Sequence, residues 1–153
     1  MTVHFGQELC RRHGEALARV ASLMLGDDDA ADEVVSDTIA AACRFDDQPE
    51  RHLATRMYLA RSVYHRCLGL LATYERFMFD SGRENRRRLR VSTMSDTQRA
   101  VVALVMFGDH DLTQTAATLN LSPATVTRHL RDATSALLGV TDPVGPRRRA
   151  STW

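Results

Sequence analysis

The sequence predicts an all-α protein of two small helical domains joined by a flexible linker, the second containing a helix-turn-helix. Over most of the chain, apolar residues recur three and four positions apart, the spacing of one helix face. No stretch shows the period-two alternation of a strand. The helical pattern breaks down in an arginine-rich region that follows a turn signal. We therefore expect a helical domain over 1–75, a linker over 76–93, a second helical domain over 94–139 and a disordered tail over 140–153.

The first domain is expected to contain three helices, over 7–25, 30–44 and 51–73, and a helical first part of the linker over 74–78 is left open. Gly26 suits the end of the first helix, because glycine readily adopts the left-handed backbone that often follows a helix. Asp27–Asp29 supply a cap and negative charge for the start of the second helix. A loop is expected over 46–50, which contains Pro49.

In the second domain, Ser95 and Gln98 have the spacing of a capping box, and the helix that they start is expected to end at Gly108. A short polar turn, Asp109–Asp111, then leads to the strongest local signal, a helix-turn-helix over 113–130.

A helix-turn-helix needs a small residue where its helices cross, a turn residue four positions on and an apolar anchor six further. Ala116, Asn120 and Val126 occupy these places. Asparagine tolerates the left-handed backbone of the turn, and Ser122 followed by Pro123 is a strong helix start.

The second helix of this motif should bury Val126, Leu130, Ala133 and Leu137. It should present a surface of short polar groups and arginines: Ser122, Ala124, Thr125, Thr127, Arg128 and Arg131. Such side chains suit a DNA major groove, where arginine pairs with guanine edges or phosphates. A helical hairpin used for protein contact is the alternative interpretation.

Charge is unevenly distributed along the 153 residues, although the net charge is only +1. Acidic residues cluster in the first third, whereas arginines gather over 83–90 and 147–149, and the chain has no lysine. An acidic region and a basic region favour two different partners.

Several protein classes are disfavoured. Apolar stretches are only a few residues long, and the N-terminus lacks the features of a secretion signal. Cys10, Cys43 and Cys67 fit no CxxC site, and we expect reduced thiols in a cytoplasmic protein without a membrane span. The histidines have no metal-site spacing, and no nucleotide-binding loop or nucleophile elbow occurs. We expect neither enzyme activity nor a cofactor or metal.

Three segments, in order, resemble the extracytoplasmic-function (group IV) sigma factors of bacterial RNA polymerase. Residues 15–45, with ADEVVSDTI at 31–39, resemble the core-binding segment of that family. YLARSVYH at 58–65 resembles the segment that faces the −10 promoter element, and MSDTQRAV at 94–101 resembles the opening of the −35-binding domain. The resemblance covers about 15–139 and ends in the helix-turn-helix.

The resemblance implies a bacterial transcription initiation factor that directs core RNA polymerase to specific promoters. Its core-polymerase-binding residues would be Asp32, Glu33, Ser36 and Asp37. On the −10 side, the DNA-binding residues would be Arg56, Tyr58, Arg61, Tyr64, His65 and Arg66, whose aromatic rings could stack on unpaired bases. The helix-turn-helix would read the −35 element. Core polymerase and promoter DNA are the implied partners, and an anti-sigma factor is a further one.

The chain departs from the family pattern mainly in the −10-facing segment. Tyr58 and His65 stand where the family usually has tryptophan and asparagine, and Ser36 replaces a glutamine of the docking helix. The loop 44–50, which captures a flipped base in the family, is short and acidic. Two alternatives therefore stay open: a free-standing helix-turn-helix transcriptional regulator, and a sigma-like adaptor without promoter-melting activity.

Overall fold

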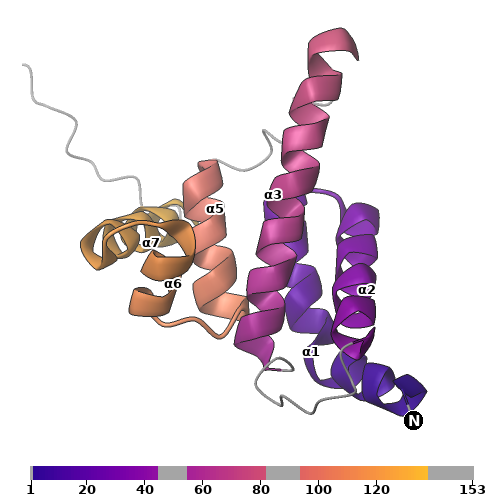
Figure 1. Ribbon diagram of the computed structural model, residues 1–153. Helices are drawn as coiled ribbons and strands as arrows, with labels where there is room; N and C mark the ends of the chain where they lie inside the picture. Colours follow the sequence, from indigo (N-terminus) through magenta and orange to yellow (C-terminus); the bar gives the residue numbers. More distant parts are fainter. Residues whose placement is uncertain (1, 45–54, 82–93, 138–153) are drawn as a thin grey trace, which may run out of the picture.

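The computed structural model describes residues 2–44, 55–81 and 94–137 (Figure 1). Within these ranges every regular element is a helix: α1 (Thr2–Leu25), α2 (Asp28–Arg44), α3 (Arg56–Ser81), α5 (Asp96–Val102), η2 (Ala103–Phe107), α6 (Leu112–Leu119) and α7 (Pro123–Leu137). The predicted all-α fold is confirmed. The predicted loop over 46–50 and the predicted tail over 140–153 lie outside the described residues.

The predicted boundary between the first two helices is confirmed. Gly26 adopts a left-handed φ of 66°, and its N–H donates to the carbonyl oxygen of Ser22 at 2.8 Å. A carboxylate oxygen of Asp27 accepts from the N–H groups of Asp29 and Ala30, at 2.9 and 3.1 Å. Asp27 therefore caps α2, which starts at Asp28, slightly before the predicted position.

The third helix was predicted too short at its C-terminal end. It was expected to stop near 73, with a helical first part of the linker left open over 74–78, whereas α3 continues without interruption to Ser81. The physical reason is that 74–81 contains neither glycine nor proline, and helix propagation meets no breaker before Gly82.

The helix that begins the second domain has the predicted capping box. The Ser95 hydroxyl accepts from the N–H of Gln98 at 3.2 Å, and the Gln98 side chain accepts from the N–H of Ser95 at 3.0 Å. Its second half, η2, is a π-helix, a wider turn that the sequence pattern did not predict. The N–H of Gly108 closes it by donating to the carbonyl oxygens of Ala103 and Leu104.

The main hydrophobic core lies among α1, α2 and α3, and it continues into the C-terminal half of the chain. Leu17, Leu59 and Val63 are among its fully buried members, and Ala103 and Leu104 of η2 belong to the same cluster. In Figure 1, α3 stands between α2 on one side and α5 on the other, with α6 and α7 outermost. The two predicted domains therefore share one core in this arrangement.

Candidate nucleic-acid interface

The acidic face of α2 is free along its length. Asp32, Glu33, Ser36 and Asp37 are all exposed, and none of the described residues forms an ion pair with their carboxylates. The opposite face of the helix is buried in the core: Ala31, Val34, Val35, Thr38 and Ile39. The predicted docking residues thus lie together on the solvent-facing side of α2 and give it a row of negative charge. The buried side of the same helix packs in the hydrophobic core.

The six α3 residues predicted on the −10 side do not form one surface. Tyr64 is only 9% exposed and belongs to the core, where burial raises the pKa of its phenol. Its ring therefore packs inward and is not a free stacking platform. Arg56 is held by α1, because its guanidinium donates to His13 and, at 2.9 Å, to the carbonyl oxygen of Arg12. Tyr64 and Arg56 therefore contribute to packing and hydrogen bonding within the fold.

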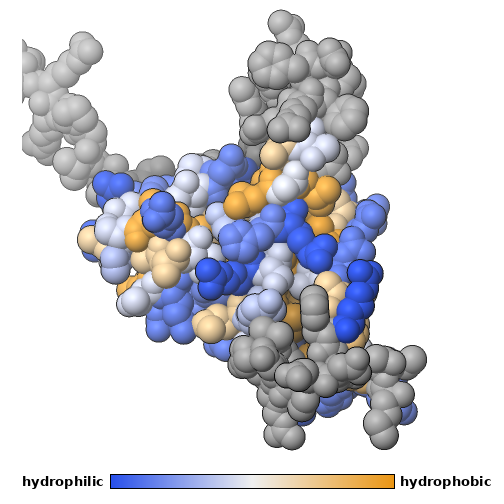
Figure 2. Space-filling view, viewed as in Figure 1, coloured by the Kyte–Doolittle hydropathy of each residue, from blue (hydrophilic) through white to orange (hydrophobic). Residues whose placement is uncertain are grey.

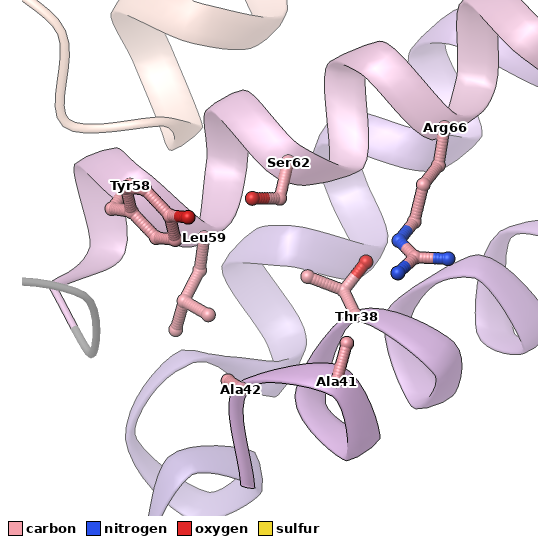
Figure 3. A pocket seen from close by; sticks show the side chains of 7 residues that line it. All are labelled: Thr38, Ala41, Ala42, Tyr58, Leu59, Ser62 and Arg66. Carbon is pink, nitrogen blue, oxygen red and sulfur yellow. The ribbon is translucent and has the colours of Figure 1, made fainter. Parts of the chain in front are cut away.

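The other four α3 residues, Tyr58, Arg61, His65 and Arg66, are exposed. Two of them border a groove of about 180 Å³ between α2 and α3, which is lined by Thr38, Ala41, Ala42, Tyr58, Leu59, Ser62 and Arg66. Figure 3 shows the guanidinium of Arg66 pointing towards Thr38, with the Tyr58 ring at the other end and the Ser62 hydroxyl between them. The groove combines a small apolar floor with hydroxyl groups and one cation.

A second groove, of about 140 Å³, separates α3 from the helix-turn-helix. Its lining comes from both halves of the chain: Met57, Tyr58, Arg61, His110, Gln114, Ala117 and Thr118. Tyr58 lies on the border of both grooves. The predicted −10 residues at this end of α3 therefore face α6 in the described arrangement.

The helix-turn-helix geometry is confirmed. Asn120 has φ 55° and ψ 47°, the left-handed conformation that the tight turn requires. Ala116 is 3% exposed and packs in a small cluster with Val101 and Val126, both fully buried. The N–H of Leu121 donates to the carbonyl oxygen of Ala116 at 2.9 Å, which closes the turn. The motif thus has its own apolar centre against α5.

The predicted recognition helix, α7, begins as expected, since the Ser122 hydroxyl accepts from the N–H of Thr125 at 3.2 Å. Ala124, Arg128 and Arg131 are exposed on one helix face, at spacings of four and three residues. The predicted residues Thr125 and Thr127 are half-buried, and their hydroxyls bond locally to Ser122 and Pro123. Arg128 and Arg131 are thus the free cations of this face among the described residues.

The contacts between the two halves of the chain were not predicted. The Cζ atom of Arg19 on α1 lies 5.6 Å from the centroid of the Phe107 ring, within reach of a cation–π interaction. A Cβ placed on Gly108 would lie 3.2 Å from the Cβ of Ala60. His110, in the turn taken for a purely polar one, is 5% exposed and its Nδ1 lies 2.7 Å from the Gly108 carbonyl oxygen. The only sequence signals for this packing were the small residues Ala60 and Gly108.

Figure 2 shows a largely hydrophilic face on which hydrophobic residues gather over the part of α3 that lies next to the grey atoms. On α3, Leu68 is 41% exposed, and Leu70 and Leu71 are partly buried. Elsewhere in the described part of the chain, Met106 is 65% exposed, more than any other large apolar side chain described, and Leu112 is 37% exposed. No helix among the described residues is long and apolar enough to cross a membrane. No group of potential metal ligands occurs within 2–44, 55–81 and 94–137.

Comparison with known proteins finds a similar arrangement among solved structures. No family model matches the chain, and no curated protein matches it. Among solved structures, the chain is similar to a chain in the structure of CnrH in complex with the cytosolic domain of CnrY. The match has a TM-score of 0.54 and 26% sequence identity, and it covers 88% of this chain and 86% of the other. The similarity therefore extends over both halves of the molecule.

Proposed function

We propose that this chain is an extracytoplasmic-function sigma factor, which docks on core RNA polymerase and directs it to specific promoters. The observation that carries the proposal is the combination, in one chain, of a free acidic face on α2 and a complete helix-turn-helix. The similarity to CnrH, an extracytoplasmic-function sigma factor, supports the same role because it spans both regions. The resemblance of the sequence segments to this family agrees in order and position.

In this proposal α2 is the polymerase-docking element. Its carboxylates at Asp32, Glu33 and Asp37 project from a helix whose other face is buried, so they are held in a fixed row. A fixed acidic row suits a basic protein surface, because opposite charges steer the encounter and fix the register. Ser36 is exposed within this row, and its small side chain does not cover the neighbouring carboxylates.

The DNA-reading element is α7. Arg128 and Arg131 are exposed and unpaired among the described residues, as groups that bind phosphates or guanine edges must be. On the −10 side, the proposal is narrower than the sequence suggested. It assigns DNA contact to Tyr58, Arg61, His65 and Arg66, and it leaves Arg56 and Tyr64 to the fold.

We also propose a protein partner that restrains the chain, of the anti-sigma class. The similar chain CnrH was solved in complex with the cytosolic domain of CnrY. Binding of the purified chain to a candidate partner, and its release from polymerase when that partner is added, would test this part.

The test of the main proposal is co-elution with bacterial core RNA polymerase in gel filtration. The wild type is expected to bind, and Asp32→Arg/Asp37→Arg is expected to lose binding. Asp132→Arg, a charge reversal at an exposed position of α7, is the control and should still bind. If the wild type does not bind core, the proposal fails and a free-standing helix-turn-helix regulator takes its place. If core binds but no promoter-directed transcription follows, an adaptor role replaces it.

A further inference from the structure

The groove between α2 and α3 contains polar groups that have no partner within the described part of the chain. Arg66 forms no ion pair with any described carboxylate, and the Ser62 hydroxyl has no hydrogen bond among the same residues. The Thr38 hydroxyl differs, because it donates to the carbonyl oxygen of Val34 at 2.8 Å and can only accept a further bond. The described lining of the groove therefore offers a free cation and a free hydroxyl donor, and it contains no carboxylate.

The rest of the lining is apolar and built from small side chains. Ala41, Ala42 and Leu59 form the floor of the groove, and Leu59 is only 1% exposed. Figure 3 shows the Tyr58 ring at one end and the Arg66 guanidinium at the other. The rise along α3 between these two residues is about 12 Å, at about 1.5 Å per residue. The groove thus runs along α3 from an aromatic ring to a cation.

The volume of the groove, about 180 Å³, limits the size of a ligand. An apolar cavity of about 150 Å³ is large enough to bind benzene. The groove between α2 and α3 therefore has room for about one aromatic ring that carries a small charged group.

The charge of the groove favours a carboxylate over other groups. A guanidinium presents its N–H donors in a planar fork that pairs with both oxygens of a carboxylate. One cation balances one carboxylate, whereas a phosphate dianion would be only half neutralised and would lie against alanine and leucine side chains. A neutral nucleobase would leave Arg66 without a counter-charge. The Ser62 hydroxyl can donate to the same ligand, and the Tyr58 ring can pack against an aromatic body.

We propose that the groove between α2 and α3 is a binding site for a small aromatic carboxylate of the benzoate class. The carboxylate of the ligand pairs with Arg66, and its ring lies on the apolar floor with one edge against Tyr58. This binding does not depend on the proposed function.

The effect of the ligand on transcription does rest on the proposed function. Tyr58 and Arg66 are two of the residues assigned to DNA on the −10 side, so a ligand that occupies both would compete with DNA there. The acidic row of α2 lies on the solvent-facing side of that helix, away from the groove, and stays free for core polymerase.

The experiment is an NMR titration of the full isotope-labelled chain with sodium benzoate. The amide resonances of residues that line the groove, Thr38, Ser62 and Arg66 among them, are expected to shift and to saturate. The expected dissociation constant is about 1 mM or lower, the range of a ligand of this size. Sodium chloride at matched ionic strength is the reference, because it supplies an anion without a ring.

Two variants remove the two recognition features separately. Arg66→Leu removes the cation at an exposed position, and Ala41→Leu fills the floor, while leucine suits a helix at both places. Each is expected to weaken benzoate binding about tenfold or more, since a hydrogen bond to a charged group or the space for the ring is lost. Arg61→Ala is the matched control and should bind as the wild type does, because Arg61 is an exposed arginine of the same helix that does not line this groove.

Two further probes test the chemistry of the ligand. Benzamide keeps the ring without the charge and should bind at least about tenfold more weakly than benzoate. Cytidine tests a nucleobase, and tighter binding of cytidine than of benzoate would overturn the proposal in favour of a base site. Absence of saturable shifts with benzoate, or equal affinity in the wild type and Arg66→Leu, would also overturn it.

The effect on transcription is measured separately. Saturating benzoate should reduce transcription from a promoter that the chain recognises and leave co-elution with core polymerase unchanged. Ala41→Leu keeps Tyr58 and Arg66 but fills the groove, so its transcription should be insensitive to benzoate. Equal inhibition of the wild type and Ala41→Leu would overturn the competition. If the chain does not bind core at all, the proposed function fails, whereas the titration still decides whether the groove is a carboxylate site.

Discussion

The Nε–H of Arg56 donates to Nδ1 of His13 across 3.2 Å, so that the first residue of α3 is tied to the middle of α1. The bond needs a free lone pair on Nδ1, and a protonated imidazole has none. Burial lowers the pKa of His13 below its ordinary value of 6.5, and the nearby charges of Arg56 and Arg12 add to this effect. The fold therefore selects the neutral form of this histidine.

From this state of His13 we predict that the chain loses stability on mild acidification. The unfolded chain takes up a proton at His13 near pH 6.5, whereas the folded chain resists it until a lower pH. The contribution of His13 to the free energy of unfolding is thus fully present above pH 6.5. This contribution is lost as the pH falls through and below that value. Urea denaturation at pH 7.5 and pH 5.5 measures it.

His13→Gln isolates the effect, because the glutamine oxygen can still accept from Arg56 but does not titrate. The difference in stability between the two pH values should shrink in this variant. His4→Gln is the control, since His4 is exposed on the same helix and should leave the difference unchanged. Identical pH profiles for wild type and His13→Gln would refute the assignment.

The turn of the helix-turn-helix yields a second prediction. At Asn120 the left-handed backbone suits asparagine or glycine, but it brings a branched side chain too close to the backbone. We expect Asn120→Val to lower the free energy of unfolding by about 1–2 kcal/mol and Asn120→Gly to lie near the wild type. Urea unfolding curves of the three proteins decide this, and equal stability of the valine and glycine variants would contradict it.

The exposed arginines of α7 should act through phosphate contacts. Each phosphate contact that is lost reduces the slope of log K against log salt by about 0.9. We expect Arg128→Ala and Arg131→Ala each to weaken binding to duplex DNA with such a change in slope, while co-elution with core polymerase stays intact. Arg11→Ala, in the other half of the chain, should leave the slope as it is. Simultaneous loss of DNA and polymerase binding would contradict the division of roles.

Thiol reactivity should follow burial. Cys67 is fully buried, which raises the pKa of its thiol to about 12, and the thiolate is the reactive form. Cys10 is exposed and Cys43 half-buried. In the native protein we expect an alkylating reagent to modify Cys10 first and Cys67 only after unfolding, as followed by mass spectrometry. Rapid modification of Cys67 in the Cys10→Ser variant would show that the core opens there.

Local signals predicted most of the helices and the whole helix-turn-helix, because caps and turns depend on neighbouring residues alone. Gly26 and Asn120 adopt the left-handed backbone that their residue types tolerate, and the side chains of Ser95 and Gln98 cap a helix start. The end of α3 was predicted only in part: a helical segment over 74–78 was left open, whereas the helix continues to Ser81, and no glycine or proline lies within 74–81.

The site was less predictable, because exposure depends on how helices pack. Tyr58 and Tyr64 look equivalent in the sequence, yet one is exposed and the other is buried in the core. Arg56 and Arg61 differ likewise, since only Arg56 meets α1. The contacts between the two halves, Arg19 with Phe107 and Gly108 with Ala60, join residues from separate helices. A periodic pattern within one segment cannot predict contacts of this kind.

The π-helix η2 makes the orientation of the C-terminal half sensitive to chain length. A π turn holds one residue more than an α turn, so deletion of one residue within Ala103–Phe107 would let a regular α-helix form. Everything beyond it would then be rotated by about 100°, the angle per residue of an α-helix. Gly108 would leave Ala60, and the helix-turn-helix would point elsewhere with its own fold intact. Related chains could therefore differ by one residue in this turn and hold their two halves at a different relative orientation. The surfaces of each half would stay the same.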